Sequence, residues 1–203
     1  INLFTNSTLE DFQQECECTF IDSASSYISL ELIYSNTPGR REDDIPVNIE
    51  KDEDYFEAKR NIEIKAFKDP DELILNYKPE IHGSPLFMGM DVGRFSDKTA
   101  YYIIGRVNGK KRSVLKLEMR NASYDTQKDV FRKLMKQLPI FRSCIDNTGI
   151  GNNLAEDMHK EFGERAEPFT MTLQSKEILA MQVKTGLERL EFLLENDREF
   201  HAQ

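Results

Sequence analysis

Two aspartates each follow a short apolar stretch, at the point where a β-strand would leave the core. Residues 86–90 lead to Asp91, and residues 144–145 lead to Asp146. A carboxylate in such a place is held by a rigid element and still faces solvent. If the two strands are neighbours in register, about 4.8 Å apart, the two carboxylates lie close enough to share a cation. Mg²⁺ suits such a site, because it binds one or two protein carboxylates and fills its other positions with water and phosphate oxygens.

Each aspartate also has a simpler interpretation, since Asp is common wherever a chain turns. The repetition of the pattern favours a site over two unrelated turns. Without a cation, two adjacent carboxylates would repel each other, and one of them would hold its proton more tightly. Asp97 lies six residues after Asp91, across the same predicted turn. It is either a further metal ligand, directly or through water, or a turn acid that faces solvent.

The apolar pattern around these residues predicts an α/β domain. We expect three antiparallel strands, the second and third joined by a tight turn at Asn108-Gly109, followed by helices that alternate with strands. The predicted strands span residues 86–92, 99–107, 112–119, 141–146 and 166–172, with a short strand near 192–194. The predicted helices span residues 123–138, 152–162 and 175–188, the last with Ser175 as its cap.

Three stretches together resemble a known family. They are MDVGRFSDKTA (residues 90–100), CIDNTGIGNNLAEDM (144–158) and LQSKEILA (173–180). Over residues 86–203 the sequence is similar to the nuclease domain of the large terminase subunit of tailed phages and prophages. Residues 9–15 and 20–22 also resemble the link that follows the packaging ATPase in such subunits.

The resemblance implies a ribonuclease-H-like fold, a mixed sheet flanked by helices in which three antiparallel strands precede alternating helices and strands. It also implies a metal-dependent endonuclease that cuts concatemeric double-stranded DNA during head packaging, in the cytoplasm of the bacterial host. The implied partners are double-stranded DNA, a small terminase subunit, a portal, and an ATPase domain upstream in the same polypeptide.

The resemblance further implies roles for individual residues. Asp91, Asp146 and Asp97 become ligands of a two-ion Mg²⁺ or Mn²⁺ site, where one ion activates water and the other steadies the leaving oxygen. The family has another acidic ligand on a C-terminal helix, which we expect beyond residue 203, so this chain alone would be weakly active or inactive. Lys176 stands where the family also has Lys. It would hold a phosphate or balance the acids, although a solvated lysine fits the sequence equally well.

Two clusters of basic residues are candidate contacts for DNA phosphates. One follows the predicted hairpin turn, and the other recurs every four residues along a predicted helix. The two clusters are Lys110, Lys111 and Arg112, and Lys128, Arg132 and Lys136. Phosphate contacts supply most of the non-specific affinity for DNA. A solvated face is nevertheless the commoner meaning of a charged stripe on a helix.

The net charge of −9 is unevenly distributed over the 203 residues. Residues 1–84 contain 8 basic and 19 acidic residues, whereas residues 85–203 contain 19 basic and 17 acidic residues. The second part is close to neutral despite its site acids, so the overall charge does not exclude DNA binding. The sequence has neither an apolar run long enough for a membrane span nor a signal peptide. Its three cysteines make no zinc or disulfide pattern, and we expect Cys144 to be a buried hydrophobe in a reducing compartment.

We expect two parts in the chain. Residues 1–84 are predicted to be a partly irregular linker after an upstream ATPase domain, and residues 85–203 a nuclease domain truncated at its C-terminus. The start at Ile1 instead of Met agrees with a piece of a longer protein. Within the linker, we expect a helix at 8–18, a helix or strand at 27–35 and again at 54–64, a loop at 36–54, a turn at 69–71 and a hinge at 78–85.

Two other functions stay open from the sequence alone. Asp91-Val92-Gly93 and residues 146–151 faintly resemble the two phosphate loops of an actin-like or sugar-kinase-like ATP-binding lobe, a fold that needs a second lobe. ATP binding without DNA cleavage would favour that function. The chain could instead be a non-catalytic docking module of a packaging motor, whose acidic first part meets a portal or small subunit. A lack of stabilisation by Mg²⁺ or Mn²⁺ would favour the docking module.

Overall fold

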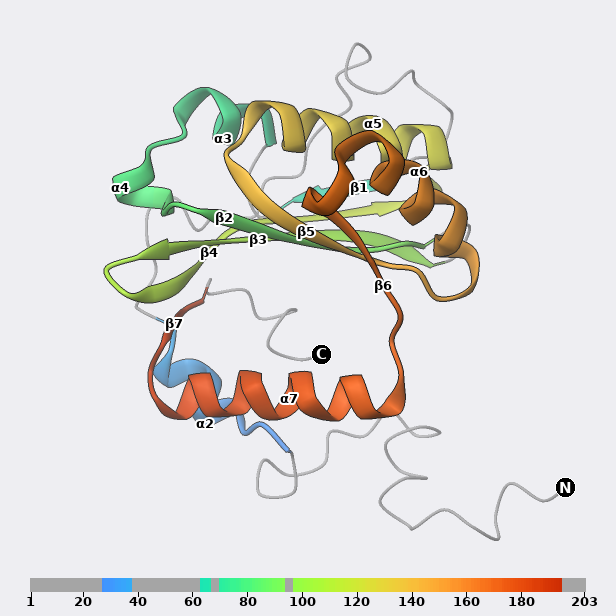
Figure 1. The fold of residues 1–203 in the computed structure, drawn as a ribbon. Helices are drawn as coiled ribbons and strands as arrows, with labels where there is room; N and C mark the ends of the chain where they lie inside the picture. The colour runs from blue at the N-terminus through green and yellow to red at the C-terminus, as the bar shows by residue number, and fades with distance from the viewer. Residues whose placement is uncertain (1–26, 38–62, 67–69, 94–96, 195–203) are drawn as a thin grey trace, which may run out of the picture.

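The computed structural model describes residues 27–37, 63–66, 70–93 and 97–194. These residues form a mixed sheet flanked by helices (Figure 1), which confirms the predicted α/β class. The strands are β1 (Glu63–Ala66), β2 (Leu86–Asp91), β3 (Lys98–Val107), β4 (Lys110–Arg120), β5 (Ile140–Asp146), β6 (Ala166–Phe169) and β7 (Phe192–Leu193). The helices are α2 (Leu30–Ser35), α3 (Pro70–Asn76), α4 (Pro79–His82), α5 (Tyr124–Gln137), α6 (Asn152–Phe162) and α7 (Leu173–Glu188), with 3₁₀ turns η1 (Gly149–Gly151) and η2 (Gly163–Arg165).

The strand order in the sheet is β1-β4-β3-β2-β5-β6, with β7 beside β4. β2, β3 and β4 pair antiparallel as successive hairpins, and β1 adds antiparallel to β4. β5 pairs parallel with β2, and β6 pairs parallel with β5. Parallel pairing is possible because a helix precedes each of β5 and β6 and returns the chain to the end of the sheet where β2 begins. The topology therefore makes neighbours of β2 and β5, which lie far apart in the sequence.

The turn between β3 and β4 is built by Asn108 and Gly109. Both residues have a positive φ, of 49° and 79°, as a two-residue type I′ hairpin requires. Glycine adopts this geometry freely and Asn tolerates it better than most residues. The turn sets the pairing of Val107 with Lys110 and thereby the register of both strands near it.

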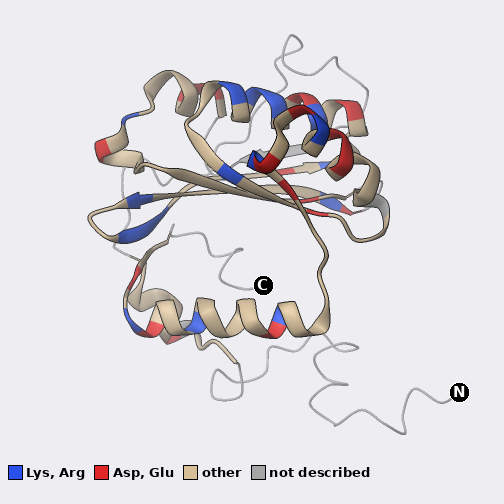
Figure 2. Ribbon diagram, viewed as in Figure 1, with Lys and Arg blue, Asp and Glu red and all other residues tan. Residues whose placement is uncertain are grey.

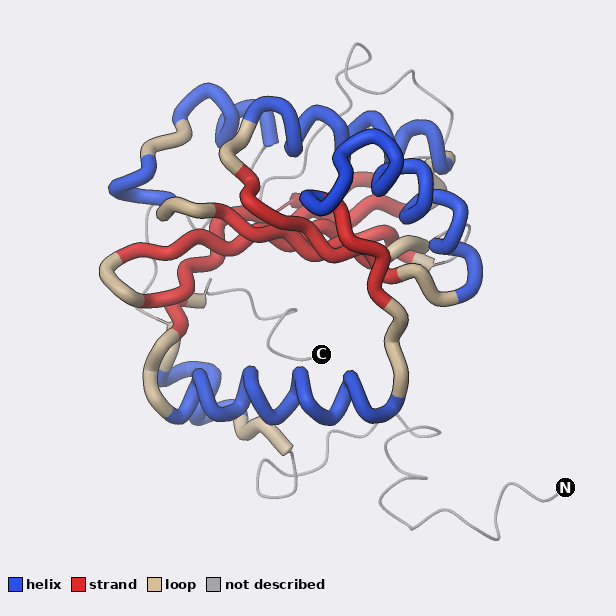
Figure 3. Tube along the Cα trace, in the orientation of Figure 1, coloured by secondary structure: helices blue, strands red, loops and turns tan. Residues whose placement is uncertain are grey.

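The apolar core lies between the sheet and the helices α3, α5 and α6, which cover one face of the sheet (Figures 1 and 3). Side chains of β2 alternate strictly between buried and exposed. The buried set is Leu86, Met88 and Met90, and it joins Phe131 and Leu134 of α5 in one cluster. Full burial of a side chain of this size contributes roughly 1.5–3 kcal/mol. The alternation places Asp91 on the other face of β2, together with Phe87 and Gly89.

α7 lies on the opposite side of the sheet from α5 and α6 (Figures 1 and 3). Several of its large apolar side chains are exposed, among them Leu173, Ile178 and Met181. α2 packs against the end of α7 through Asn36, a buried residue whose side-chain amide donates to the carbonyl oxygen of Leu187 at 2.9 Å. An early segment of the chain is thus fastened to a late one.

Most elements of the sheet domain lie where the apolar pattern predicts them, but three details were wrong. α7 begins at Leu173, and its N-cap is Thr172, whose side-chain oxygen accepts from the backbone N–H of Ser175 at 3.1 Å. β6 ends at Phe169, three residues early. Cys144 is exposed, because it lies on the face of β5 opposite to the buried Ser143 and Ile145.

Elements before the expected boundary at residue 85 also pack onto the sheet or its helices. β1 pairs with β4. Residues 70–76 form α3 where a turn was expected, because a proline suits the start of a helix and Leu73 reaches the core. Asp71 of α3 forms an ion pair with Lys133 of α5. The helix predicted at 8–18 and residues 38–62 lie outside the described residues. In the described ranges, none of the helices combines the length and apolar character of a membrane span.

Candidate metal centre

Asp91 and Asp146 stand side by side at the ends of two neighbouring parallel strands. Met90 of β2 pairs with Ile145 of β5, and each aspartate is the next residue along its strand. Met90 and Ile145 point into the core, since their exposed fractions are 4% and 0%. Alternation along the strands then directs both carboxylates to the opposite face. The structure therefore brings these two predicted residues together, while their role as ligands stays a prediction.

Asp91 lies in an environment that disfavours its negative charge. The pKa of its carboxyl is raised, first by partial burial, next by the charge of Asp146, and least by the charge of Asp97. The backbone N–H of Val92 acts in the opposite direction by stabilising the carboxylate. Because like charges and poor solvation both oppose ionisation, a cation held between Asp91 and Asp146 would relieve the local repulsion.

Asp146 is oriented by the residue two positions after it. Its Oδ1 accepts a hydrogen bond from the backbone N–H of Thr148 at 2.8 Å and another from the Thr148 hydroxyl at 2.6 Å. Both bonds fall on one oxygen, and in the described part of the chain no group donates to Oδ2. The carboxylate is therefore fixed by one oxygen and can offer the other to a cation. Thr148 was missed in the sequence, although Asp followed two residues later by Thr is typical of such a side-chain turn.

The Gly-rich turn after β5 packs directly against both strand ends. A Cβ atom at Gly151 would lie 2.2 Å from the backbone oxygen of Asp146 and 3.3 Å from the Cβ of Val92. Gly149 has a φ of +61°, which favours glycine. Because Gly151 has no side chain, the turn from β5 into α6 can close tightly beside the end of β2.

Asp97 lies immediately before β3 and is exposed. Its charge reaches Asp91 only weakly, as the smallest of the causes that raise the pKa of Asp91. Among the residues that the structure describes, no group of three or more His, Cys, Asp or Glu is arranged to hold a metal ion. The described centre is consequently a pair of carboxylates with a third acid nearby.

A separate cluster of charges lies in the same row of the sheet. Asp91 pairs with Ala100, and Ala100 pairs in turn with Glu118 of β4. Glu118 is buried and accepts from Lys98 at 2.8 Å, with Lys116 at 3.3 Å from its other oxygen. Burial opposes ionisation of Glu118, but the two lysines outweigh it and lower its pKa. Glu118 therefore holds the ammonium of Lys98, the residue next to Asp97 in the sequence.

The basic hairpin lies away from the carboxylate pair, and Lys176 makes no described contact with it. Figure 2 shows basic residues in the β3–β4 hairpin. Because Leu86 pairs with Gly105 and Asp91 with Ala100, this hairpin lies at the end of the sheet opposite to Asp91. Lys110 is exposed, and Lys111 forms an ion pair with Glu191 at 2.9 Å. Lys176 is exposed in the first turn of α7, and among the described contacts no hydrogen bond or ion pair joins it to either aspartate. Their predicted contacts with phosphate are neither supported nor opposed by these positions.

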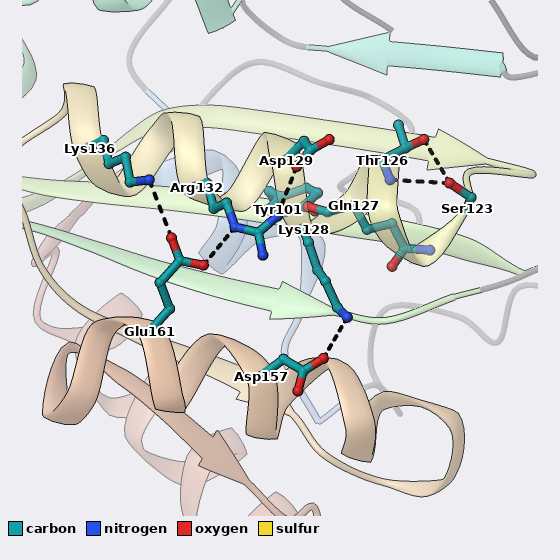
Figure 4. A network of polar contacts seen from close by, with 10 residues as sticks. All are labelled: Tyr101, Ser123, Thr126, Gln127, Lys128, Asp129, Arg132, Lys136, Asp157 and Glu161. Atoms are coloured by element: carbon teal, nitrogen blue, oxygen red, sulfur yellow. Dashed lines mark hydrogen bonds and ion pairs between the residues drawn. The ribbon is translucent and has the colours of Figure 1, made fainter. Parts of the chain in front are cut away.

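The basic stripe of α5 faces acidic residues of α6 (Figure 4). Lys128 pairs with Asp157 at 2.6 Å, Arg132 with Glu161 at 2.6 Å, and Lys136 with Glu161 at 3.3 Å. Hydrogen bonding to Arg132 lowers the pKa of Glu161. These pairs join two helices of the same face of the sheet. These ion pairs explain why the basic residues of α5 recur every four residues. The acids of α6 balance the charges of these basic residues.

Neither a family model nor a curated protein matches the sequence, but solved structures of similar fold exist. The large terminase nuclease from thermophilic phage G20c with bound magnesium has a TM-score of 0.53 and 19% identity, covering 70% of this chain and 69% of that chain. The zinc-bound form gives 0.52 and 19%, covering 70% and 76%. The cobalt-bound form gives 0.51 and 18%, covering 70% and 69%. The chain thus shares the fold of these nuclease domains, as the resemblance of its sequence to terminase nucleases implied.

Proposed function

We propose that the chain is the nuclease domain of a phage or prophage large terminase subunit, a metal-dependent endonuclease that hydrolyses phosphodiester bonds of concatemeric double-stranded DNA. One observation carries the proposal. Asp91 and Asp146 form a carboxylate pair at the ends of β2 and β5, within the fold of a terminase nuclease whose structures hold magnesium, zinc or cobalt.

The donor set suits Mg²⁺ or Mn²⁺, because both proposed ligands are carboxylates and these ions prefer oxygen ligands. The pKa of Asp91 is raised by partial burial and by the charge of Asp146, and positive charge is favoured where a carboxylate is disfavoured in this way. When bound, two such ions would activate a water molecule and stabilise the leaving 3′ oxygen. Two carboxylates on rigid strands leave most of each ion's coordination to water and phosphate.

Four residues of the chain divide the remaining work. Asp91 and Asp146 hold the ions, and the hydrogen bonds from Thr148 keep Asp146 in one orientation. Asp97, exposed and close enough to influence Asp91, serves as a further ligand through a bridging water. The proposed ligands would bind metal ions and not the edges of bases, so we expect cleavage with little sequence preference.

The DNA surface that we propose comprises Lys110, Lys111 and Arg112 of the hairpin, with Lys176 of α7 as a phosphate contact. Lys128 and Arg132 are left out, because their ion pairs with Asp157 and Glu161 join α5 to α6. Lys111 also has an acidic partner, Glu191, but it stands beside the exposed Lys110 in the hairpin. In the packaging machine the chain works beside an ATPase domain of the same polypeptide, a small terminase subunit and a portal, in the cytoplasm of the bacterial host.

The test is nicking of supercoiled plasmid in the presence of Mn²⁺. We expect the wild-type chain to convert plasmid slowly, and Asp91→Asn and Asp146→Asn to abolish conversion and the stabilisation by Mn²⁺. Asn keeps the shape of Asp and removes its charge. Glu164→Gln is the matched control, since Glu164 is exposed in η2 and should leave both readouts unchanged.

Two results would overturn the proposal and identify its competitor. ATP binding in calorimetry, with no cleavage by any preparation, would favour an ATP-binding lobe. A melting temperature that is insensitive to Mn²⁺ and Mg²⁺, together with no cleavage, would favour a docking module.

A further inference from the structure

A buried amide connects α5 to the end of β2. Gln127 lies in the first turn of α5 and has an exposed fraction of 0%. Its Nε2 donates to the backbone oxygen of Gly93 at 2.9 Å and to that of Ala122 at 3.1 Å. Because both partners are carbonyl oxygens, which only accept, the orientation of the amide is set by these two bonds. Figure 4 shows the Gln127 side chain extending from α5 toward the strands.

The peptide that Gln127 contacts is two residues beyond Asp91. The backbone N–H of Gly93 donates to the hydroxyl of Thr99 at 3.1 Å, and that hydroxyl donates to the Gly93 oxygen at 3.0 Å. A Cβ at Gly93 would lie 2.2 Å from the backbone oxygen of Lys98. The Gly93 peptide is thus held by α5 on one side and by the first residues of β3 on the other, with no space for adjustment.

The amide is not what stability alone would select at this position. In the described part of the chain, the Oε1 atom of Gln127 is buried and accepts no hydrogen bond. A buried acceptor without a donor is unfavourable, whereas a methionine would fill a similar volume without that penalty. The two donated bonds are therefore the feature that distinguishes Gln127 from an apolar residue of the same size.

We propose that Gln127 and Thr99 are positioning residues of the candidate metal centre, which clamp the Gly93 peptide and thereby hold the Asp91 carboxylate at the spacing from Asp146 that a shared cation requires. This proposal rests on the proposed function. Groups behind the ligands matter in such sites, because a small displacement of one ligand changes the coordination distances of the ion. Both side chains are buried, so each acts on Asp91 through the backbone that follows β2.

The first test replaces Gln127 with methionine, Gln127→Met, in the full chain. We expect the melting temperature without metal to change little, because the lost hydrogen bonds are offset by removal of the unpartnered Oε1. We expect the dissociation constant for Mn²⁺, measured from the paramagnetic resonance signal of free Mn²⁺, to rise by about tenfold or more, the usual effect of removing a group behind a metal ligand.

The second test uses a matched pair at the other side of the clamp. Thr99→Val keeps the shape of the side chain and removes both hydrogen bonds to Gly93. Thr99→Ser keeps the hydroxyl and loses one methyl group. We expect Thr99→Val to weaken Mn²⁺ binding as Gln127→Met does. We expect Thr99→Ser to bind Mn²⁺ with an affinity close to that of the wild type.

Tyr101→Phe separates positioning from general stability. The Tyr101 hydroxyl donates to the backbone oxygen of Gln127 at 2.6 Å, so its removal loosens α5 and leaves the amide bond to Gly93 in place. We expect a lower melting temperature with unchanged affinity for Mn²⁺. If affinity instead follows melting temperature across all four variants, or if Gln127→Met and Thr99→Val bind Mn²⁺ like the wild type, the positioning role is wrong and the metal centre stands. If the wild type itself binds no Mn²⁺, the proposed function is wrong and the positioning role is wrong with it.

Discussion

Partial burial and, second to it, the charge of Asp146 raise the pKa of Asp91, although a whole helix and two strands separate the two aspartates in the sequence. The relationship arises from one paired row, Met90 with Ile145, which sets the two strand ends level. The sheet holds both carboxylates at a distance where they disfavour each other. The same two carboxylates therefore lower the stability of the metal-free chain and favour the binding of a divalent cation. A change at either aspartate should alter both quantities.

The coupling predicts how stability without metal depends on pH. The pKa of Asp91 is raised in the folded chain, whereas it takes an ordinary value of about 3.9 in the unfolded chain. The folded state holds the proton more tightly, so the contribution of this group is fully present below that ordinary value and is lost as pH rises through the folded-state pKa. Asp91→Asn removes this loss. Urea unfolding at a series of pH values should show the variant gaining stability relative to the wild type just above pH 4.

Glu118 affects stability with the opposite dependence on pH. The informative quantity is therefore the difference in free energy of unfolding between the wild type and Asp91→Asn. For Glu118, burial opposes ionisation but Lys98 and Lys116 lower the pKa. Its stabilisation is present above the unfolded-state pKa and is lost as pH falls through the folded-state pKa, in wild type and variant alike. Saturating Mn²⁺ should reverse the order at neutral pH and make the wild type the more stable protein. A difference that is independent of both pH and Mn²⁺ would contradict the prediction.

The two basic clusters should differ in their effect on DNA binding. Lys110→Ala removes an exposed cation from the hairpin, so we expect weaker binding to a fluorescent duplex and a loss of about one from the slope of log affinity against log salt. Lys128→Ala removes an ion pair with Asp157 instead. We expect that variant to melt at a lower temperature and to bind DNA with unchanged affinity and slope. Anisotropy titrations at several salt concentrations decide between them, and equal losses for both variants would be evidence against the assignment.

Two glycines of the turn after β5 should respond differently to alanine. At Gly149, a Cβ has open space, but φ is +61°, so we expect Gly149→Ala to lose about 1–2 kcal/mol and keep its response to Mn²⁺. At Gly151, the Cβ would lie 2.2 Å from the backbone oxygen of Asp146. The strand end must shift, so we expect Gly151→Ala to be less stable than Gly149→Ala and to lose its thermal stabilisation by Mn²⁺. Urea and thermal unfolding measure both effects, and a normal Mn²⁺ response in Gly151→Ala would show that the turn does not set the site.

The local sequence predicts β2, β3 and β5 to within one or two residues. Each run is short, rich in branched or aromatic residues and bounded by residues that favour turns. Adjacency of β2 and β5 is a different matter, because it depends on the order of strands in the sheet, and no local pattern encodes it. The resemblance to a family supplied that order before the structure confirmed it.

Some roles could not be inferred from the sequence, since they depend on groups far away along the chain. The stripe containing Lys128 and Arg132 was compatible with a phosphate surface or a solvated face, and its ion pairs with α6 could not be foreseen from α5 alone. Cys144 was expected to be buried, because an apolar run does not show which face of its sheet packs against the core helices α5 and α6. Gln127 carried no signal at all, since its partner Gly93 lies in another element.

Asn36 should hold α2 against the elements that end the described chain. Its amide donates to the carbonyl oxygens of Leu32 and Leu187 at 3.0 and 2.9 Å and accepts from the Phe192 N–H at 3.3 Å. Asn36→Ala removes these bonds, so amide hydrogen exchange in α2 and β7 should accelerate by about tenfold, while β2 and β5 keep their protection. Exchange followed by mass spectrometry measures each segment. Ser35→Ala, which loses a bond only within α2, should leave β7 unchanged, and acceleration throughout the sheet would contradict a local clasp.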